Sequence, residues 1–137
     1  MSVTTTTHPA VEDFLAMVNT RDADRVDTHC TFEHIDHNPV VPNGREANRL
    51  FWKNVFAAFP DITATVKDLL VSGDRVAGRF EYEGTHQGEF LGIPATYRKV
   101  QIRSIDIWRL EDGLFAEHWD QTNLTEVLQE LRAAAHA

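Results

Sequence analysis

A histidine and a carboxylate near the C-terminus are the side chains best suited to chemistry. They lie in the stretch LFAEHWD, residues 114–120, where the residues alternate as they do in a strand. Since strand side chains point alternately to two faces, His118 and Asp120 should share the face that begins with apolar Leu114. Apolar surroundings bring the pKa of a carboxylate nearer to neutrality, where acid/base catalysts work best. We therefore predict that Asp120 is the catalytic acid and base, and that His118 binds a substrate oxygen or orients the carboxylate. The alternative is that Asp120 is only a polar residue at an exposed strand end.

Arg103 is a candidate partner for Asp120 from the preceding strand. If Asp112-Gly113 forms a two-residue hairpin turn, Ile105 lies opposite Asp120 and Arg103 lies diagonal to it on the same face. A longer turn would shift this register and separate the two charges. Arg103 is therefore predicted either to bind substrate or to form a salt bridge with a neighbouring acid.

A second polar cluster, residues 33–38, lies early in the chain. Strand alternation puts His34, Asp36 and Asn38 on one side and His37 on the other. The spacing matches no zinc signature, and the strand would have to bend before His34 and His37 could reach one ion. We expect no metal and no cofactor.

Composition and charge limit the partners of the protein. The chain has 137 residues and a formal net charge of −8, which disfavours nucleic acid and anionic membrane surfaces because both are polyanions. An uncharged or weakly charged, hydrophobic small molecule fits better. Cys30 is the only cysteine, no signal segment opens the chain and no apolar run approaches the ~20 residues that span a bilayer. We expect a cytoplasmic protein that is not in a membrane.

Helical periodicity dominates the first half of the chain and strand alternation the second half. Residues 1–8 should be a loose tail, and residues 9–137 a single domain. Helices are predicted over residues 9–18, 23–29, 45–59 and 124–135, and strands over residues 30–37, 62–71, 75–85, 97–110 and 114–120. This order predicts an α+β fold, in which a cone-shaped, curved antiparallel sheet is closed by three N-terminal helices, with a short C-terminal helix. The outer face of the sheet, carrying Trp108 and Trp119, would need cover, which a homodimer could supply.

Several short motifs resemble, in order, the signature of the SnoaL-like polyketide cyclase family, within the nuclear transport factor 2-like superfamily. They are Phe59-Pro60-Asp61, Ser72-Gly73-Asp74-Arg75-Val76, residues 84–94 and Asp112-Gly113 ahead of Glu117-His118-Trp119-Asp120. Upstream, His37-Asn38-Pro39 and Gly44-Arg45-Glu46-Ala47 extend the match to residues 9–135. The resemblance implies a dimeric α+β cone and a metal-free acid/base site.

The resemblance also implies roles for particular residues. It places the catalytic acid and base at Asp120, and His37 and Asn38 in the pocket wall. Ketosteroid isomerases of the superfamily carry a base on the early segment, which makes Asp36 a reserve candidate. His86, which ends a strand among glycines, is predicted to be either a pocket-rim residue that binds substrate or a turn residue.

These expectations favour a cofactor-independent cyclase that closes a ring in an aromatic polyketide intermediate, in antibiotic biosynthesis, by intramolecular aldol condensation. The alternatives are a related hydroxylase, an isomerase, an epoxide hydrolase or a non-catalytic small-molecule-binding protein, because one fold hosts many functions. An epoxide hydrolase usually needs two carboxylates flanking an arginine, and only Asp120 and Arg103 stand out here. The sequence names no substrate.

Overall fold

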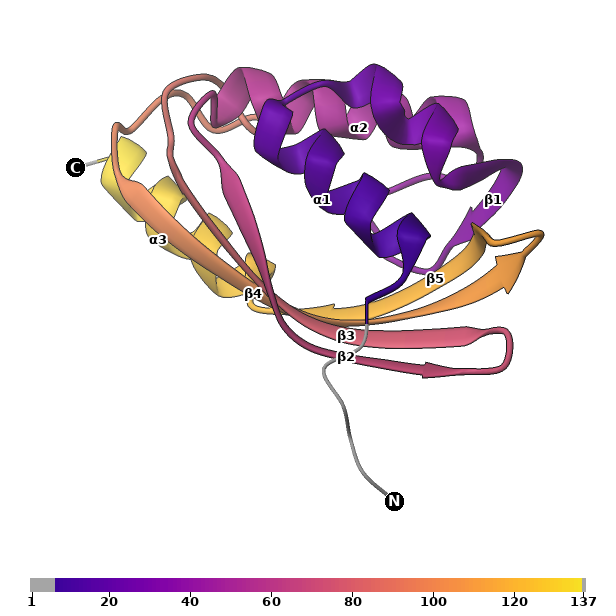
Figure 1. Ribbon diagram of the computed structural model, residues 1–137. Helices are drawn as coiled ribbons and strands as arrows, with labels where there is room; N and C mark the ends of the chain where they lie inside the picture. The colour runs from indigo at the N-terminus through magenta and orange to yellow at the C-terminus, as the bar shows by residue number, and fades with distance from the viewer. Residues whose placement is uncertain (1–6, 137) are drawn as a thin grey trace.

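The centre of the fold is a strongly curved sheet of five strands, with helices over its concave face (Figure 1). The computed structural model describes residues 7–136. The elements are α1 (Pro9–Thr20), the 3₁₀ helix η1 (Ala23–Thr28), β1 (Cys30–Asp36), α2 (Arg45–Ala58), β2 (Thr63–Ser72), β3 (Arg75–Thr85), β4 (Lys99–Glu111), β5 (Leu114–Thr122) and α3 (Leu124–Ala135). The predicted α+β fold is confirmed, and its second helix is of the 3₁₀ type. No helix among these residues is long and apolar enough to cross a membrane.

Helix α1 begins with a proline in its first turn and a capping histidine before it. Pro9 suits the first turn of a helix because its missing N–H would have no helical partner there. The Nδ1 atom of His8 accepts a hydrogen bond from the backbone N–H of Ala10 at 3.1 Å, so His8 caps the helix. Residues 1–6 of the predicted tail lie outside the described residues.

The strands are arranged in the order β1-β5-β4-β3-β2. Strands β2 to β5 are antiparallel neighbours, as predicted, but β1 pairs with β5 in parallel. The sheet is therefore mixed, which corrects the expectation of a wholly antiparallel sheet. Parallel strands need a long connection, and here the chain between β1 and β5 includes α2 and the other three strands. This pairing places Asp36 beside His118.

A β-bulge at Ala116 changes the register between β4 and β5. The predicted two-residue turn is present, since Asp112 and Gly113 both have positive φ, of 51° and 78°. Leu110 pairs with Phe115, but Arg109 pairs with Glu117, so Ala116 has no partner of its own. Such an extra residue shifts every later side chain by one position.

The shift reverses the predicted faces of β4. Asp120 lies opposite Asp106 rather than Ile105, and His118 lies opposite Trp108. Ile105 is exposed on the outer face, whereas Trp108, which we expected outside, is buried on the concave face. The predicted placement of Arg103 beside Asp120 is therefore wrong.

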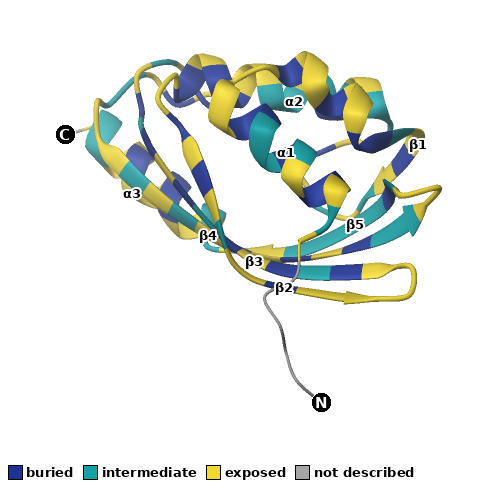
Figure 2. Ribbon diagram, viewed as in Figure 1, coloured by how far each residue is buried: buried dark blue, intermediate teal, exposed yellow. Residues whose placement is uncertain are grey.

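Aromatic rings fill the space between the helices and the sheet. Phe14 of α1 packs edge-on against Phe80 of β3, with the ring centroids 5.9 Å apart, and lies at the same distance from Trp108. Buried residues accordingly concentrate where the helices face the sheet (Figure 2). At the far end of the sheet α3 buries Val127, Leu128 and Leu131.

Gly88, in the loop between β3 and β4, packs closely against the end of α2 and donates a backbone hydrogen bond to Ala58. A Cβ atom there would lie 2.6 Å from the carbonyl oxygen of Ala57, closer than real atoms approach. We predict that Gly88→Ala lowers the free energy of unfolding by about 1–3 kcal/mol, because the backbone must move. Urea denaturation measures this change, with Gln87→Ala as the exposed neighbouring control. Equal midpoints for the two variants would show that the contact is not tight.

Candidate active site

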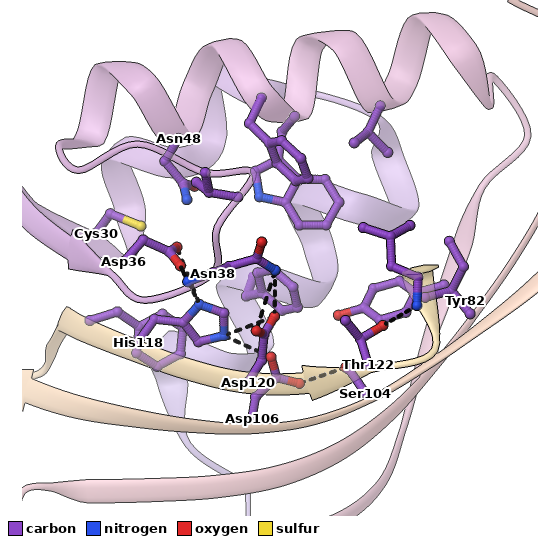
Figure 3. A pocket seen from close by; sticks show the side chains of 18 of the residues that line it. Cys30, Asp36, Asn38, Asn48, Tyr82, Ser104, Asp106, His118, Asp120 and Thr122 are labelled. Carbon is purple, nitrogen blue, oxygen red and sulfur yellow. Dashed lines mark hydrogen bonds and ion pairs between the residues drawn. The ribbon is translucent and has the colours of Figure 1, made fainter. Parts of the chain in front are cut away.

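A cavity lies between α2 and the concave face of the sheet (Figure 3). About 120 Å³ of it is open to the centres of water-sized molecules, so side chains do not fill it. Its wall is mostly aromatic and aliphatic, as small-molecule sites usually are. The polar residues that Figure 3 labels in this wall are Asp36, Asn38, Asn48, Tyr82, Ser104, Asp106, His118, Asp120 and Thr122.

His118 is held between two buried carboxylates. Its Nδ1 atom lies 3.2 Å from Asp36, and its Nε2 atom lies 2.7 Å from Asp106. Burial alone would lower the pKa of His118, but hydrogen bonds to Asp106 and then Asp36 outweigh burial and raise the pKa to about 10. His118 is therefore an imidazolium at neutral pH, with both N–H groups already engaged. Its ring also stacks on Trp108, 5.2 Å between centroids.

Asp120 lies on the same strand face as His118. Its Oδ2 atom is 4.0 Å from Nε2 of His118, and its side chain is 12% exposed. The amide of Asn38 donates to both carboxylate oxygens, at 3.0 and 3.3 Å. Burial is the largest influence and raises the pKa of Asp120, opposed by Asn38 and His118 and reinforced by Asp106 and Asp36. The arrangement suits a carboxyl group that both takes and returns a proton.

Asp106 and Tyr82 are candidate functional residues that our reading of the sequence missed. The hydroxyl of Ser104 donates to Asp106 at 2.6 Å, which fixes the carboxylate against His118. Burial, followed by the nearby Asp106, raises the pKa of Tyr82 well above its usual value against the effect of a hydrogen bond with Ser104, so its hydroxyl remains protonated. No local signal marked Asp106, because alternation counted from the turn placed it outside. Alternation along the predicted strand 75–85 could have placed Tyr82 inside.

Strand β1 and the loop after it turn three polar residues toward the cavity. His34, Asp36 and Asn38 line it, as the alternation predicted. His37 instead points outward, where its Nε2 atom lies 2.8 Å from Glu117 and its ring stacks on Trp119, 5.0 Å between centroids. The expectation that His37 lines the cavity is therefore wrong, because strand alternation turns its side chain to the outer face.

Two further candidates, His86 and Arg103, lie away from the cavity wall. His86 is fully buried, with its Nδ1 atom 2.9 Å from the hydroxyl of Thr96 and its ring against Phe59. Arg103 is exposed, and its backbone N–H and C=O bond to Asn123. Neither side chain can contact a ligand beside Asp120 in this arrangement.

Asp106, His118 and Asp120 could together supply ligands to a metal ion. One ligand atom from each lies within 4.8 Å of the others. An ion at this place would have to displace the proton on Nε2 of His118, which the Asp106 carboxylate binds at 2.7 Å. The donor set therefore suits a protonated imidazole better than a metal ligand.

Known proteins share both the sequence pattern and the fold. The profile of the SnoaL-like polyketide cyclases matches residues 9–131. TsrD from Streptomyces laurentii is 36% identical over 90% of this chain and 92% of its own, with a TM-score of 0.83. IdmH from Streptomyces antibioticus, provisionally described as a polyketide cyclase, is 30% identical over 89% and 95% of the two chains, with a TM-score of 0.72.

A third structure has a different provisional activity. AclR from Streptomyces galilaeus, provisionally described as a hydroxylase, is 28% identical over 89% of this chain and 92% of its own, with a TM-score of 0.76. No curated protein is similar enough in sequence to count as a match. The profile spans most of the described residues and includes the motifs that resemble the family. The fold of the chain is also that of the similar structures. The chain therefore belongs to the SnoaL-like polyketide cyclase family.

Proposed function

We propose that this protein is a cofactor-independent cyclase that closes a ring in an aromatic polyketide intermediate by intramolecular aldol condensation. The observation that carries the proposal is the carboxyl group of Asp120, whose pKa is raised although it lies beside an imidazolium that is charged at neutral pH, in a mostly apolar cavity. Proton abstraction next to a carbonyl needs a base of raised pKa and a nearby positive charge. The buried free thiol of Cys30 suits the cytoplasm, where we place the enzyme.

In the proposed reaction Asp120 removes a proton from a carbon flanked by two carbonyl groups. The resulting enolate attacks a ketone of the same molecule, a carbon–carbon bond forms, and the new alkoxide receives the proton from Asp120. Negative charge thus moves from the carboxylate to substrate oxygens and back. The fixed positive charge of His118, 4.0 Å from Asp120, stabilises the carboxylate in the resting state and the oxyanion during the reaction.

Tyr82 is the side chain we propose as the donor to the substrate oxygen. Both N–H groups of His118 already point at carboxylates, so His118 acts through its charge. The hydroxyl of Tyr82 remains protonated in the same cavity wall, near enough to Asp106 and Asp120 for their charges to raise its pKa. Arg103, which we had considered for this role, lies outside the wall.

The alternatives differ in what the cavity must contain. A hydroxylase is favoured by the likeness to AclR and could use the same acid and cavity. An epoxide hydrolase of the usual kind needs an arginine between two carboxylates, and the described residues of the cavity wall include none. Asp36, the base of the isomerase alternative, is only 2% exposed and engaged by His118, so it is less free to accept a proton. A binding protein would need only the apolar wall.

We also propose that two copies of the chain associate through the outer face of the sheet. Ile105 and Ile107 of β4 are 58% and 43% exposed there, and Trp119 of β5 lies on the same face. Exposed apolar side chains that are neighbours in a sheet favour burial against a partner.

Asp120→Asn should fold normally and lose at least about 10²-fold in turnover, because the amide cannot accept the substrate proton. Mass spectrometry of products from polyketide methyl esters and polycyclic ketones measures this, with Arg103→Ala as the control that keeps activity. A new product of unchanged mass indicates cyclisation or isomerisation, one added oxygen a hydroxylase, and added water a hydrolase. Full turnover by Asp120→Asn would contradict the mechanism, and binding without any product would favour a binding protein.

The pH profile should have two limbs. Activity falls at low pH as Asp120 takes up a proton, with a midpoint above the ordinary carboxyl pKa of 3.8, and falls near pH 10 as His118 loses its proton. Asp106→Asn removes a carboxylate that holds this proton, so the upper limb should move down by about one to two pH units. Asp74→Asn, an exposed change of the same charge, should leave both limbs in place. An upper limb unaffected by Asp106→Asn would refute the role given to His118.

Ile105→Asp should separate the proposed homodimer, because a charge in an apolar interface cannot be solvated. Light scattering after size-exclusion chromatography should then give half the mass found for the unaltered protein. Leu50→Asp, at an equally exposed position on α2, serves as the control and should stay dimeric. A monomeric unaltered protein would rule out the interface.

A further inference from the structure

The cavity wall holds two further histidines, His29 and His34, of which His34 lies near the site already described, with its ring centroid 6.4 Å from that of His118. Both side chains line the cavity wall and are almost fully buried, 1% and 2% exposed. His29 precedes β1, and its carbonyl accepts a hydrogen bond from the N–H of Phe115, at the start of β5. Asp120 lies five residues further along that strand, so its backbone is roughly 15 Å from that of Phe115 at the usual rise of a strand. The proposed catalytic site uses neither histidine.

Both imidazoles are uncharged at neutral pH. Burial is the main cause that lowers the pKa of each to about 4, and their mutual proximity lowers that of His29 further. A neutral imidazole has one nitrogen that donates a hydrogen bond and one that accepts. These two rings therefore differ from His118, whose pKa is about 10.

The neighbour Thr28 determines which nitrogen of His29 accepts. The hydroxyl of Thr28 donates its only hydrogen to the carbonyl oxygen of Arg25 at 2.6 Å. The same hydroxyl lies 3.2 Å from Nδ1 of His29, so Nδ1 must carry the hydrogen and donate it. The remaining nitrogen, Nε2, is then an acceptor.

That acceptor is unpaired within the described residues. Nε2 of His29 is buried and has no hydrogen-bond partner there, and Nδ1 of His34 is in the same position. Unpaired buried polar atoms destabilise a folded protein and are uncommon in native structures. A group that enters the cavity and donates a hydrogen bond would relieve this cost.

Aromatic rings form a stack between His29 and His118 in the cavity wall. Phe115 stacks on Trp108, 4.4 Å between centroids, Trp108 stacks on His118, and His29 packs edge-on against Phe115. A planar ring system that binds beside this stack can have one end at Asp120 and the other toward His29.

We infer that His29, supported by His34, forms a subsite for a hydroxyl group on an aromatic ring of the substrate, at the end remote from the reacting carbon. A hydroxyl can donate to Nε2 of His29, whereas a carbonyl oxygen or a carboxylate would meet a lone pair with a lone pair. A methyl ether lacks the hydrogen and is rejected. This inference deepens the proposed function and rests on it for the orientation of the substrate.

Binding of two matched probes tests the subsite without turnover. The unaltered protein should bind 2-naphthol about tenfold more tightly than 2-methoxynaphthalene, which corresponds to one added hydrogen bond. His29→Phe keeps a ring in the wall and removes the acceptor, so its affinities for the two probes should be equal. His37→Phe alters a histidine on the outer face and should keep the preference. Quenching of tryptophan fluorescence reports the binding.

A nitrogen NMR measurement on the unaltered protein covers the case in which His29→Phe does not fold. The ¹⁵N shifts should show hydrogen on Nδ1 of His29, and 2-naphthol, but not its methyl ether, should move the Nε2 resonance. Equal affinities in the unaltered protein, a preference that survives in His29→Phe, no binding of 2-naphthol, or hydrogen on Nε2 would each overturn the inference. Asp120→Asn should keep the probe preference, so a failure of the cyclase mechanism and a failure of this subsite give different results.

Discussion

A protonated histidine between two buried carboxylates is the interaction on which the concave face depends. His118 comes from β5, Asp106 from β4 and Asp36 from β1, so three strands must be in register for the cation to be paired on both sides. Buried charges are costly unless they are paired and hydrogen-bonded. Pairing His118 on both sides therefore depends on two features: the position of the edge strand β1, which brings Asp36, and the bulge at Ala116, which brings Asp106 onto the same face as His118.

The same pairing distributes the acid/base roles that we propose. Asp36 and Asp106 are engaged by the imidazolium, whereas Asp120 is held by Asn38 and its side chain is more exposed than theirs. Three carboxylates around one cation leave an excess of negative charge in a poorly solvated place, which favours proton uptake by one of them. Burial is the largest cause of the raised pKa of Asp120, and the charges of Asp106 and Asp36 add to it. An acid close to a cation is thus a product of burial and of local charge balance.

The cavity wall contains two kinds of histidine. His118 is charged because two carboxylates face it, and His29 and His34 are neutral because burial lowers the pKa of each. Stacked aromatic rings lie between His118 and His29. Family members with this fold include provisional cyclases and a provisional hydroxylase, so the placement of such polar groups, more than the fold, is what should distinguish their reactions.

The sequence by itself determined the helices, the strands, the hairpin turn at Asp112-Gly113 and the shared face of His118 and Asp120. These features follow from alternation, periodicity and turn residues, which act between near neighbours in the chain. Only the tertiary structure decided that Asp106 faces His118 and that Arg103 does not, because an unpaired residue in a bulge leaves no mark in the alternation. The partner strand of β1 was likewise undetermined, since strand pairing depends on contacts between segments some eighty residues apart.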